Sequence, residues 1–147
     1  MIRVADVMAR IEERVPDLAG KLGTATDFAA LIERNQVSQR PGASGFVLPG
    51  RLSGGAVGAM AGLFTQSVGQ GVIVVLSVRV ASDPTGAAGL DQLSPVVDAV
   101  IRAVCGWSPD NAPGVWALVS AELVGSTAGV LIYQIDFTLQ DQLRITP

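Results

Sequence analysis

The chain contains no histidine, and it has one cysteine, one lysine and one tyrosine among its 147 residues. The absence of histidine excludes Ser-His-Asp and Cys-His catalytic arrangements and every histidine metal site. A single cysteine, Cys105, allows no disulfide within the chain, and a thiolate metal cluster would need ligands from elsewhere. We expect Cys105 to be buried on an apolar helix. These absences remove most hydrolases.

Positive charge and long apolar runs are also scarce. A net charge of −3 with Lys21 as the one lysine argues against a dedicated nucleic-acid binder. No apolar run reaches the ~20 residues that a membrane-spanning helix needs, because Ser77 and Arg79 end the longest run. The first residues lack the order of a signal peptide. We therefore expect a cytoplasmic chain that does not enter a membrane.

The glycine runs do not match a phosphate-binding loop. GGAVGAMAG and GQG lack both the Walker lysine and the G-x-G-x-x-G spacing after a strand. The aspartates Asp83, Asp91, Asp98 and Asp136 are scattered along the chain, and cap or surface roles account for them. We therefore predict no catalytic residue, no metal ligand and no cofactor, and hence no enzyme.

What the chain has in abundance is apolar side chains. With 49% apolar and 16% charged residues, its composition is that of a globular protein, and residues 1–147 can form one domain with a substantial core. Between Pro41 and Ser82 the charged residues are Arg51 and Arg79. This neutral third is typical of a subunit interface, but a glycine-rich loop followed by a core strand explains it equally well.

One stretch, Phe64–Val80, has strong strand periodicity. Its apolar side chains fall mainly on even-numbered positions and its polar ones on odd-numbered positions. The pattern continues without a change of parity through Gly69–Gly71, so we predict one long central strand that bends at these glycines. A three-residue loop centred on Gln70 is the alternative. A straight strand of this length would span about 56 Å at about 3.3 Å per residue, so it must bend or project beyond its core.

The remaining pattern predicts an α+β domain. Helical spacing indicates an amphipathic helix over residues 2–14, a second helix capped by Thr26 or Asp27, and a third that starts at Ser94–Pro95 and ends at Gly106. Strands are predicted at 45–49, 115–124 and 130–140, the last with one dry and one wet face. We therefore expect a four-stranded, largely antiparallel sheet with helices packed on one face, and unprotected strand edges that favour self-association.

The segment Gly50–Gly62 has no periodicity, and its glycines predict a mobile loop. Its small, spaced apolar side chains favour order against a partner surface, although a loop without a role is the alternative. Trp107 follows the helix end at Gly106, and we predict that it is a structural anchor. The residues that we expect at an interface are Arg51, Leu52, Val57, Met60, Leu63, Gln66 and Gln70.

Several short series resemble bacteriophage tail terminator proteins, also called tail-completion proteins. They are Ala43–Pro49 (ASGFVLP), Thr65–Gln66 before the Val-rich strand, Asp83–Ala88 (DPTGAA), Leu90–Leu93 (LDQL) and Gly106–Pro109 (GWSP). The resemblance extends over nearly the whole chain in the same order. The Gly50–Gly62 segment is where this chain is distinctive.

The resemblance implies a structural virion protein. Members of this family form a hexameric ring on the last ring of the tail tube, end its polymerisation and offer a surface to the neck proteins near the head. The implied partners are other copies of the chain, the tail tube protein and the neck or connector proteins, with DNA only passing through the ring and no membrane. Assembly in the host cytoplasm is implied as well. A tail-tube or neck connector subunit is the alternative, and a small-molecule-binding or enzymatic domain is a third.

Overall fold

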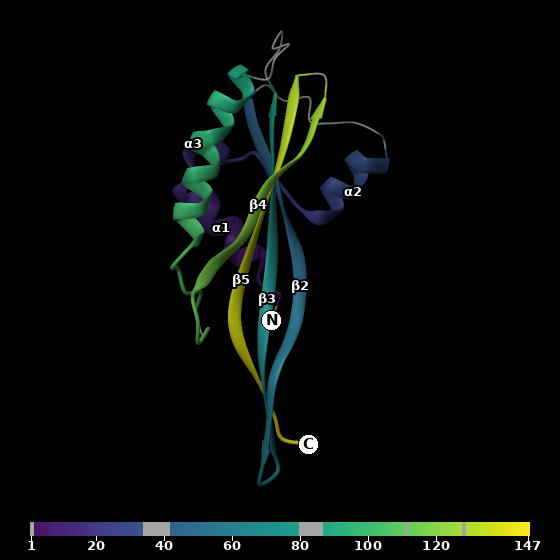
Figure 1. Ribbon diagram of the computed structural model, residues 1–147, viewed down its shortest axis with the longest axis vertical. Helices are drawn as coiled ribbons and strands as arrows, with labels where there is room; N and C mark the ends of the chain where they lie inside the picture. Colours follow the sequence, from purple (N-terminus) through teal and green to yellow (C-terminus); the bar gives the residue numbers. More distant parts are fainter. Residues whose placement is uncertain (1, 34–41, 80–86, 111, 128) are drawn as a thin grey trace.

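The structure is a computed structural model of the 147-residue chain and describes residues 2–33, 42–79, 87–110, 112–127 and 129–147. Over these residues the chain is an α+β domain with one mixed sheet, in the strand order β1-β2-β3-β5-β4 (Figure 1). In chain order the elements are α1 (Val4–Arg14), the 3-10 helix η1 (Pro16–Leu18), β1 (Leu22–Gly23), α2 (Ala25–Glu33), β2 (Gly42–Met60), β3 (Leu63–Arg79), α3 (Ala87–Val104), β4 (Trp116–Thr127) and β5 (Val130–Ile145).

Strand β3 is the centre of the sheet, which confirms the prediction of one long central strand. It pairs antiparallel with β2 on one side and with β5 on the other along nearly its whole length. Gln70 lies inside the strand, opposite Leu139, so the alternative of a loop at this position is wrong. Figure 1 shows β3 continuing past the helices towards the far tip of the molecule.

The loop predicted at residues 50–62 is wrong, because most of this segment belongs to β2. The strand pairs with β3 as far as Met60 opposite Leu63, and the chain turns at Ala61 and Gly62, where φ is 48° and 79°. The Gly62 conformation is one that glycine adopts without a steric penalty. The β2–β3 hairpin therefore extends to this turn.

The glycines that suggested a loop allow the backbones of β2 and β3 to come close together. A Cβ atom built on Gly50 would lie 2.8 Å from the carbonyl carbon of Gly71, and one built on Gly71 would lie 2.8 Å from the backbone of Arg51. The contact lies beside a register shift between Pro49 and Leu52, where the irregular pairing bends the strand. Such close approach requires residues without a side chain.

The prediction of four strands omitted β1. This strand, Leu22–Gly23, pairs in parallel with Gly45 and Phe46 of β2 and makes the sheet mixed. A two-residue strand is too short to produce a periodic pattern in the sequence, which is why the prediction missed it.

The helices cover both faces of the sheet, so the prediction that they pack on one face is wrong for α2. Buried side chains of α1 and α3 form one core with those of β2, β3 and β5, and Figure 1 shows both helices on the same side. Phe28 of α2 packs instead on Phe46, with ring centroids 5.2 Å apart. Phe46 points away from the face of its neighbour Val47, which is in the core, because side chains alternate along a strand.

Helix α3 begins at Ala87, seven residues before the predicted start at Ser94, and Pro95 lies inside it. A proline inside a helix costs about 3 kcal/mol, yet Leu93 and Val96 on either side of it are both buried. Tertiary packing therefore holds the first turns of the helix. The predicted end of this helix is confirmed at Gly106, where φ is 79° and the N–H donates to the Trp116 carbonyl at 2.8 Å.

Helix α2 is capped by Thr24 and not by Thr26 or Asp27 themselves. The Thr24 N–H and hydroxyl donate to Asp27 Oδ2 at 2.8 and 3.0 Å, and the Asp27 N–H donates to Thr24 Oγ1 at 3.4 Å. The backbone and then the side-chain hydrogen bond from Thr24 lower the pKa of Asp27. This reciprocal pair is a capping box.

The last strand has the predicted dry and wet faces. Leu131, Ile135, Phe137 and Leu139 are buried, whereas Gln134, Thr138 and Gln140 point to the opposite face. The predicted hairpin of β4 and β5 and the amphipathic helix α1 are confirmed as well. Among the described residues, no helix combines the length and the hydropathy needed to span a membrane.

Candidate interaction surfaces

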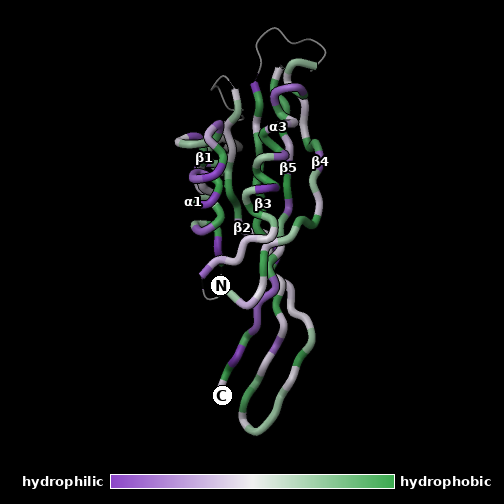
Figure 2. Tube along the Cα trace, turned by 90° about the vertical axis from the view of Figure 1, so that its left-hand side faces the viewer, coloured by the Kyte–Doolittle hydropathy of each residue, from purple (hydrophilic) through white to green (hydrophobic). Residues whose placement is uncertain are grey.

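The β2–β3 hairpin projects from the core as an arm. We define the arm as residues 51–70 together with residues 139–145 of β5, which accompany β3 as far as Ile145 opposite Phe64. Figures 1 and 2 show the arm extending beyond the helices at the lower end of the molecule. The arm therefore has two broad faces away from the core.

The structure brings the residues predicted at an interface together on this arm. Six of the seven form directly opposed pairs across β2 and β3, and Arg51 lies in the register shift next to Leu52. The pairs are Leu52 with Gln70, Val57 with Gln66, and Met60 with Leu63.

Exposure separates these residues into two groups. Met60 is 80%, Val57 61% and Leu52 57% exposed, whereas Gln70 is 3% exposed. Gln70 Nε2 donates to Asp141 Oδ2 at 2.6 Å, and the same carboxylate oxygen lies 3.8 Å from Arg3. Gln70 therefore joins the base of the arm to the start of α1, and its role at an interface stays a prediction.

One face of the arm carries a group of apolar side chains, with Gln66, Gln70 and Asp141 among them. Even-numbered β3 positions carry the core residues Val72 and Val74, and the same face continues into the arm. Residues on this face, or paired with residues on it, form the arm patch: Leu52, Val57, Phe64, Leu143 and Ile145. The opposite face carries small and polar residues, together with two apolar residues at the tip. The small and polar ones are Ser53, Gly58, Thr65, Gln140, Gln142 and Arg144, and the apolar ones are Met60 and Leu63. The arm thus exposes apolar side chains on both of its faces.

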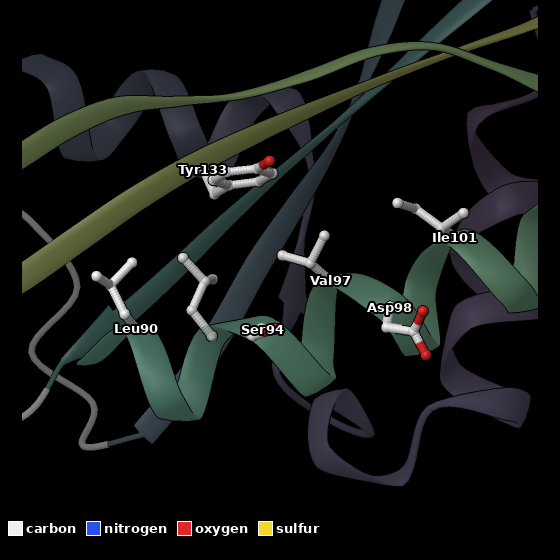
Figure 3. Close-up of a pocket in the computed structure, with 7 residues that line it drawn as sticks. Leu90, Ser94, Val97, Asp98, Ile101 and Tyr133 are labelled. Carbon is white, nitrogen blue, oxygen red and sulfur yellow. The ribbon is translucent and has the colours of Figure 1, made fainter. Parts of the chain in front are cut away.

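A second apolar surface lies beside α3, and the sequence analysis did not predict it. A groove of about 330 Å³ separates α3 from Tyr133 of β5. In Figure 3 the side chains of Leu90, Val97 and Ile101 point from α3 towards the sheet strand that carries Tyr133. The lining residues are Leu90, Leu93, Ser94, Val97, Asp98, Ile101 and Tyr133. We call this surface the α3 groove.

Strand β4 extends the α3 groove at the edge of the sheet. Leu123 pairs with Tyr133, so the two side chains share a face about 5 Å apart. Register shifts at Val119 and Val124 each add one residue to β4 that has no direct partner in β5, so the side chains after each shift switch to the other face of the sheet. Apolar residues are therefore exposed along the described part of β4. The exposed ones are Leu118, Val119, Leu123 and Val124, and Val115 just before the strand is exposed as well. An apolar edge strand of this kind is a site for association.

Charged groups near these surfaces do not converge on a point. Asp98 in the groove wall accepts from Arg102 at 2.8 Å, and both side chains are largely exposed. Within the described residues no cluster of three or more Cys, Asp or Glu side chains could hold a metal ion. Cys105 follows the last residue of α3 and is half-buried against the core. The absence of enzyme activity stays a prediction.

Trp107 is half-buried and packs against the core. The Arg10 guanidinium lies 5.2 Å from the centroid of the Trp107 ring, and the Trp107 carbonyl accepts a hydrogen bond from the Trp116 N–H at 2.9 Å. Its role as an anchor stays a prediction. The fully buried tryptophan is Trp116, which ranks first by volume among the fully buried side chains. The sequence analysis placed Trp116 in the predicted strand 115–124 but did not single it out as a core residue.

The described residues thus form a small α+β domain that exposes an arm and an apolar groove beside α3. The family model for the phage tail terminator protein matches residues 1–147. The chain therefore belongs to the phage tail terminator family, a family of phage tail structural proteins, and the resemblance of its sequence is confirmed. No curated protein matches the chain.

Proposed function

We propose that this protein forms a ring, a hexamer as the family resemblance implies, that caps the head-proximal end of the phage tail tube. The ring ends tube polymerisation and presents its other side to the neck proteins. It assembles in the host cytoplasm and has no enzymatic role. The match of the family model to the whole chain carries this proposal.

The arm supports the proposal because its tip can reach a surface that the core cannot. Met60 and Leu63 pair at the tip, and both are exposed. Methionine adapts its shape to a contact surface better than a branched side chain does. We therefore assign the contact with the tail tube to the tip of the arm.

The polar face of β4 and β5 suits a passage for DNA. Asp136 accepts from Gln134 at 3.0 Å and from Ser120 at 3.3 Å, and Glu122 is exposed on the same face. Acidic and amide side chains on this face repel phosphate or leave it unbound, whereas DNA-binding surfaces concentrate lysine and arginine. DNA would therefore pass without being held.

The test is polymerisation of purified tail tube protein in the presence of this chain. Electron microscopy should show the chain as a ring at one end of each tube, and tubes should stop growing. The variant Met60→Asp with Leu63→Asp should still form rings but lose the ability to stop growth. Tubes that elongate normally with the parent chain, or filaments made of this chain itself, would refute the capping function.

A further inference from the structure

We propose that the arm patch of one copy docks into the α3 groove of the next copy. The proposal rests on the ring proposed above and names the two surfaces that join its subunits. A contact of this kind joins different surfaces of the two copies, and its repetition from copy to copy gives a closed ring where the rotation between neighbours divides a full turn. Each copy then offers its arm to one neighbour and its groove to the other.

The two surfaces do not meet within one copy. Tyr133 pairs with Leu76, towards the end of β3 at Arg79, whereas the arm patch ends at Phe64 at the other end of the same strand. Figure 2 shows this separation, with α3 beside the upper part of the sheet and the arm below it. Both apolar surfaces are therefore open in a single chain, and a second copy supplies the partner for each.

The surfaces match in length and in charge. Residues 51–60 of the arm span about 33 Å at about 3.3 Å per residue, and the 18 residues of α3 span about 27 Å at about 1.5 Å per residue. The arm carries Arg51 beside its patch, and its one acidic residue on the patch face, Asp141, lies near Arg3 at the base of the arm. Asp98 lies in the groove wall, where it also contacts Arg102. Opposite charges at the edges of two apolar surfaces favour one orientation of the contact.

The area of the contact sets its strength. Three strand widths of about 4.8 Å over about 33 Å give the arm a face of about 470 Å², compared with about 800 Å² per partner in a stable interface. A single contact is therefore weak. A closed ring is stronger, because each copy is held by two contacts at once.

The test uses two variants, each of which damages one surface at exposed positions. The arm variant is Leu52→Asp with Val57→Asp, and the groove variant is Leu90→Glu with Leu123→Glu. Each variant alone should be monomeric at a concentration at which the parent forms rings. At a higher concentration, which the weaker single contact requires, each variant alone should stay monomeric. An equal mixture should then form a dimer of one copy of each and nothing larger, because one intact arm and one intact groove remain. Sedimentation velocity measures all three samples.

Control variants place the same charges elsewhere on the same elements. Ser53→Asp with Ser67→Asp adds two charges to the polar face of the arm, and Gln92→Glu with Ala117→Glu adds two outside the groove. Both controls should melt and assemble as the parent does. Loss of rings in these controls, rings in either surface variant, or a mixture that stays monomeric would overturn the arm-to-groove contact.

The outcomes separate this inference from the proposed function. If the parent forms rings and caps tubes while the arm variant still forms rings, the arm-to-groove contact is wrong and the capping function stands. If the arm variant keeps its rings but loses capping, the patch contacts the tube instead of a neighbour, which also overturns the inference. A parent chain that neither forms rings nor caps tubes would refute both.

Discussion

Replacement of Gly71 by alanine tests whether residues 50–60 are a strand bound to β3. A Cβ atom at position 71 would lie 2.8 Å from both the amide nitrogen and the carbonyl oxygen of Arg51. These are backbone atoms, so no side-chain rotation relieves the contact. The β2 backbone would have to move away from β3 at the bend beside Pro49.

The cost follows from this displacement. Overpacking by one methyl group in a tightly packed region typically destabilises a protein by about 1 to 3 kcal/mol. For a chain of this length that corresponds to a fall in Tm of about 3 to 12 °C. The same displacement changes the angle at which the arm leaves the core, so we expect ring formation to be impaired as well.

Gly69 provides the matched control, because it lies two residues away on the same strand and face. A Cβ atom there would meet its nearest atoms, from Gln140 and Thr138, at 3.5 Å, which is an ordinary contact distance. Gly69→Ala should therefore melt at the parent temperature or slightly above it, since alanine lowers the entropy of the unfolded chain. Differential scanning calorimetry on both variants measures the difference. If Gly71→Ala melts like Gly69→Ala, β2 and β3 do not approach each other as described.

Three further predictions concern the rest of the chain. Trp116→Ala should lower the free energy of unfolding by about 3 to 5 kcal/mol. Trp107→Ala should lower it by less, because Trp107 is half-buried and its cation–π contact with Arg10 is worth about 0.5 to 1 kcal/mol. Urea titration ranks the two variants, and a Trp107→Ala variant as stable as the parent would rule out an anchoring role. The hydrogen bonds from Thr24 lower the pKa of Asp27, so the cap contributes its full stability above pH 3.8, the ordinary pKa, and this stability is lost as the pH falls through the lowered pKa. The difference in melting temperature between the parent and Asp27→Asn should therefore shrink on acidification through this range. A difference that does not depend on pH would count against the cap. Zn²⁺, Mg²⁺, ATP and EDTA should leave the melting temperature unchanged, and a shift of many degrees with any of them would contradict a purely structural role.

The elements that the sequence predicted well are those whose pattern is set by local geometry. The alternation of β3 and β5 and the helical spacing of α1 arise from one buried face on a regular element, so the residues themselves carry the signal. The elements that it predicted poorly depend on contacts between distant residues. Gly50 and Gly71 permit a close approach between the backbones of β2 and β3, and Pro95 is held in α3 by the packing of its neighbours. Glycine and proline are ambiguous when read alone.

The same reasoning applies to the candidate site. The exposed apolar residues of the arm were predicted because they form one continuous segment, although that segment was predicted as a loop. The burial of the Gln70 side chain was not predicted, since it depends on the contact with Asp141 on another strand. The α3 groove was missed because Leu90 and Tyr133 come together only through the packing of α3 on β5. No local pattern connects residues so far apart in the chain.

The shape of the arm also indicates how it meets a partner. Pairing of β2 with β3 shifts between Pro49 and Leu52 and again between Gly54 and Val57, and such shifts twist a strand and interrupt the row of groups that could pair with another chain. The free edge of β2 is therefore a poor template for adding a strand. The face of the arm is different, because Val57 and Leu52 are exposed there and the charged residue on this face, Asp141, lies at the base of the arm beside Arg3. In the proposed contact a second copy gains apolar contact from the face of the arm, which is the geometry that docking into a groove requires and that strand addition does not.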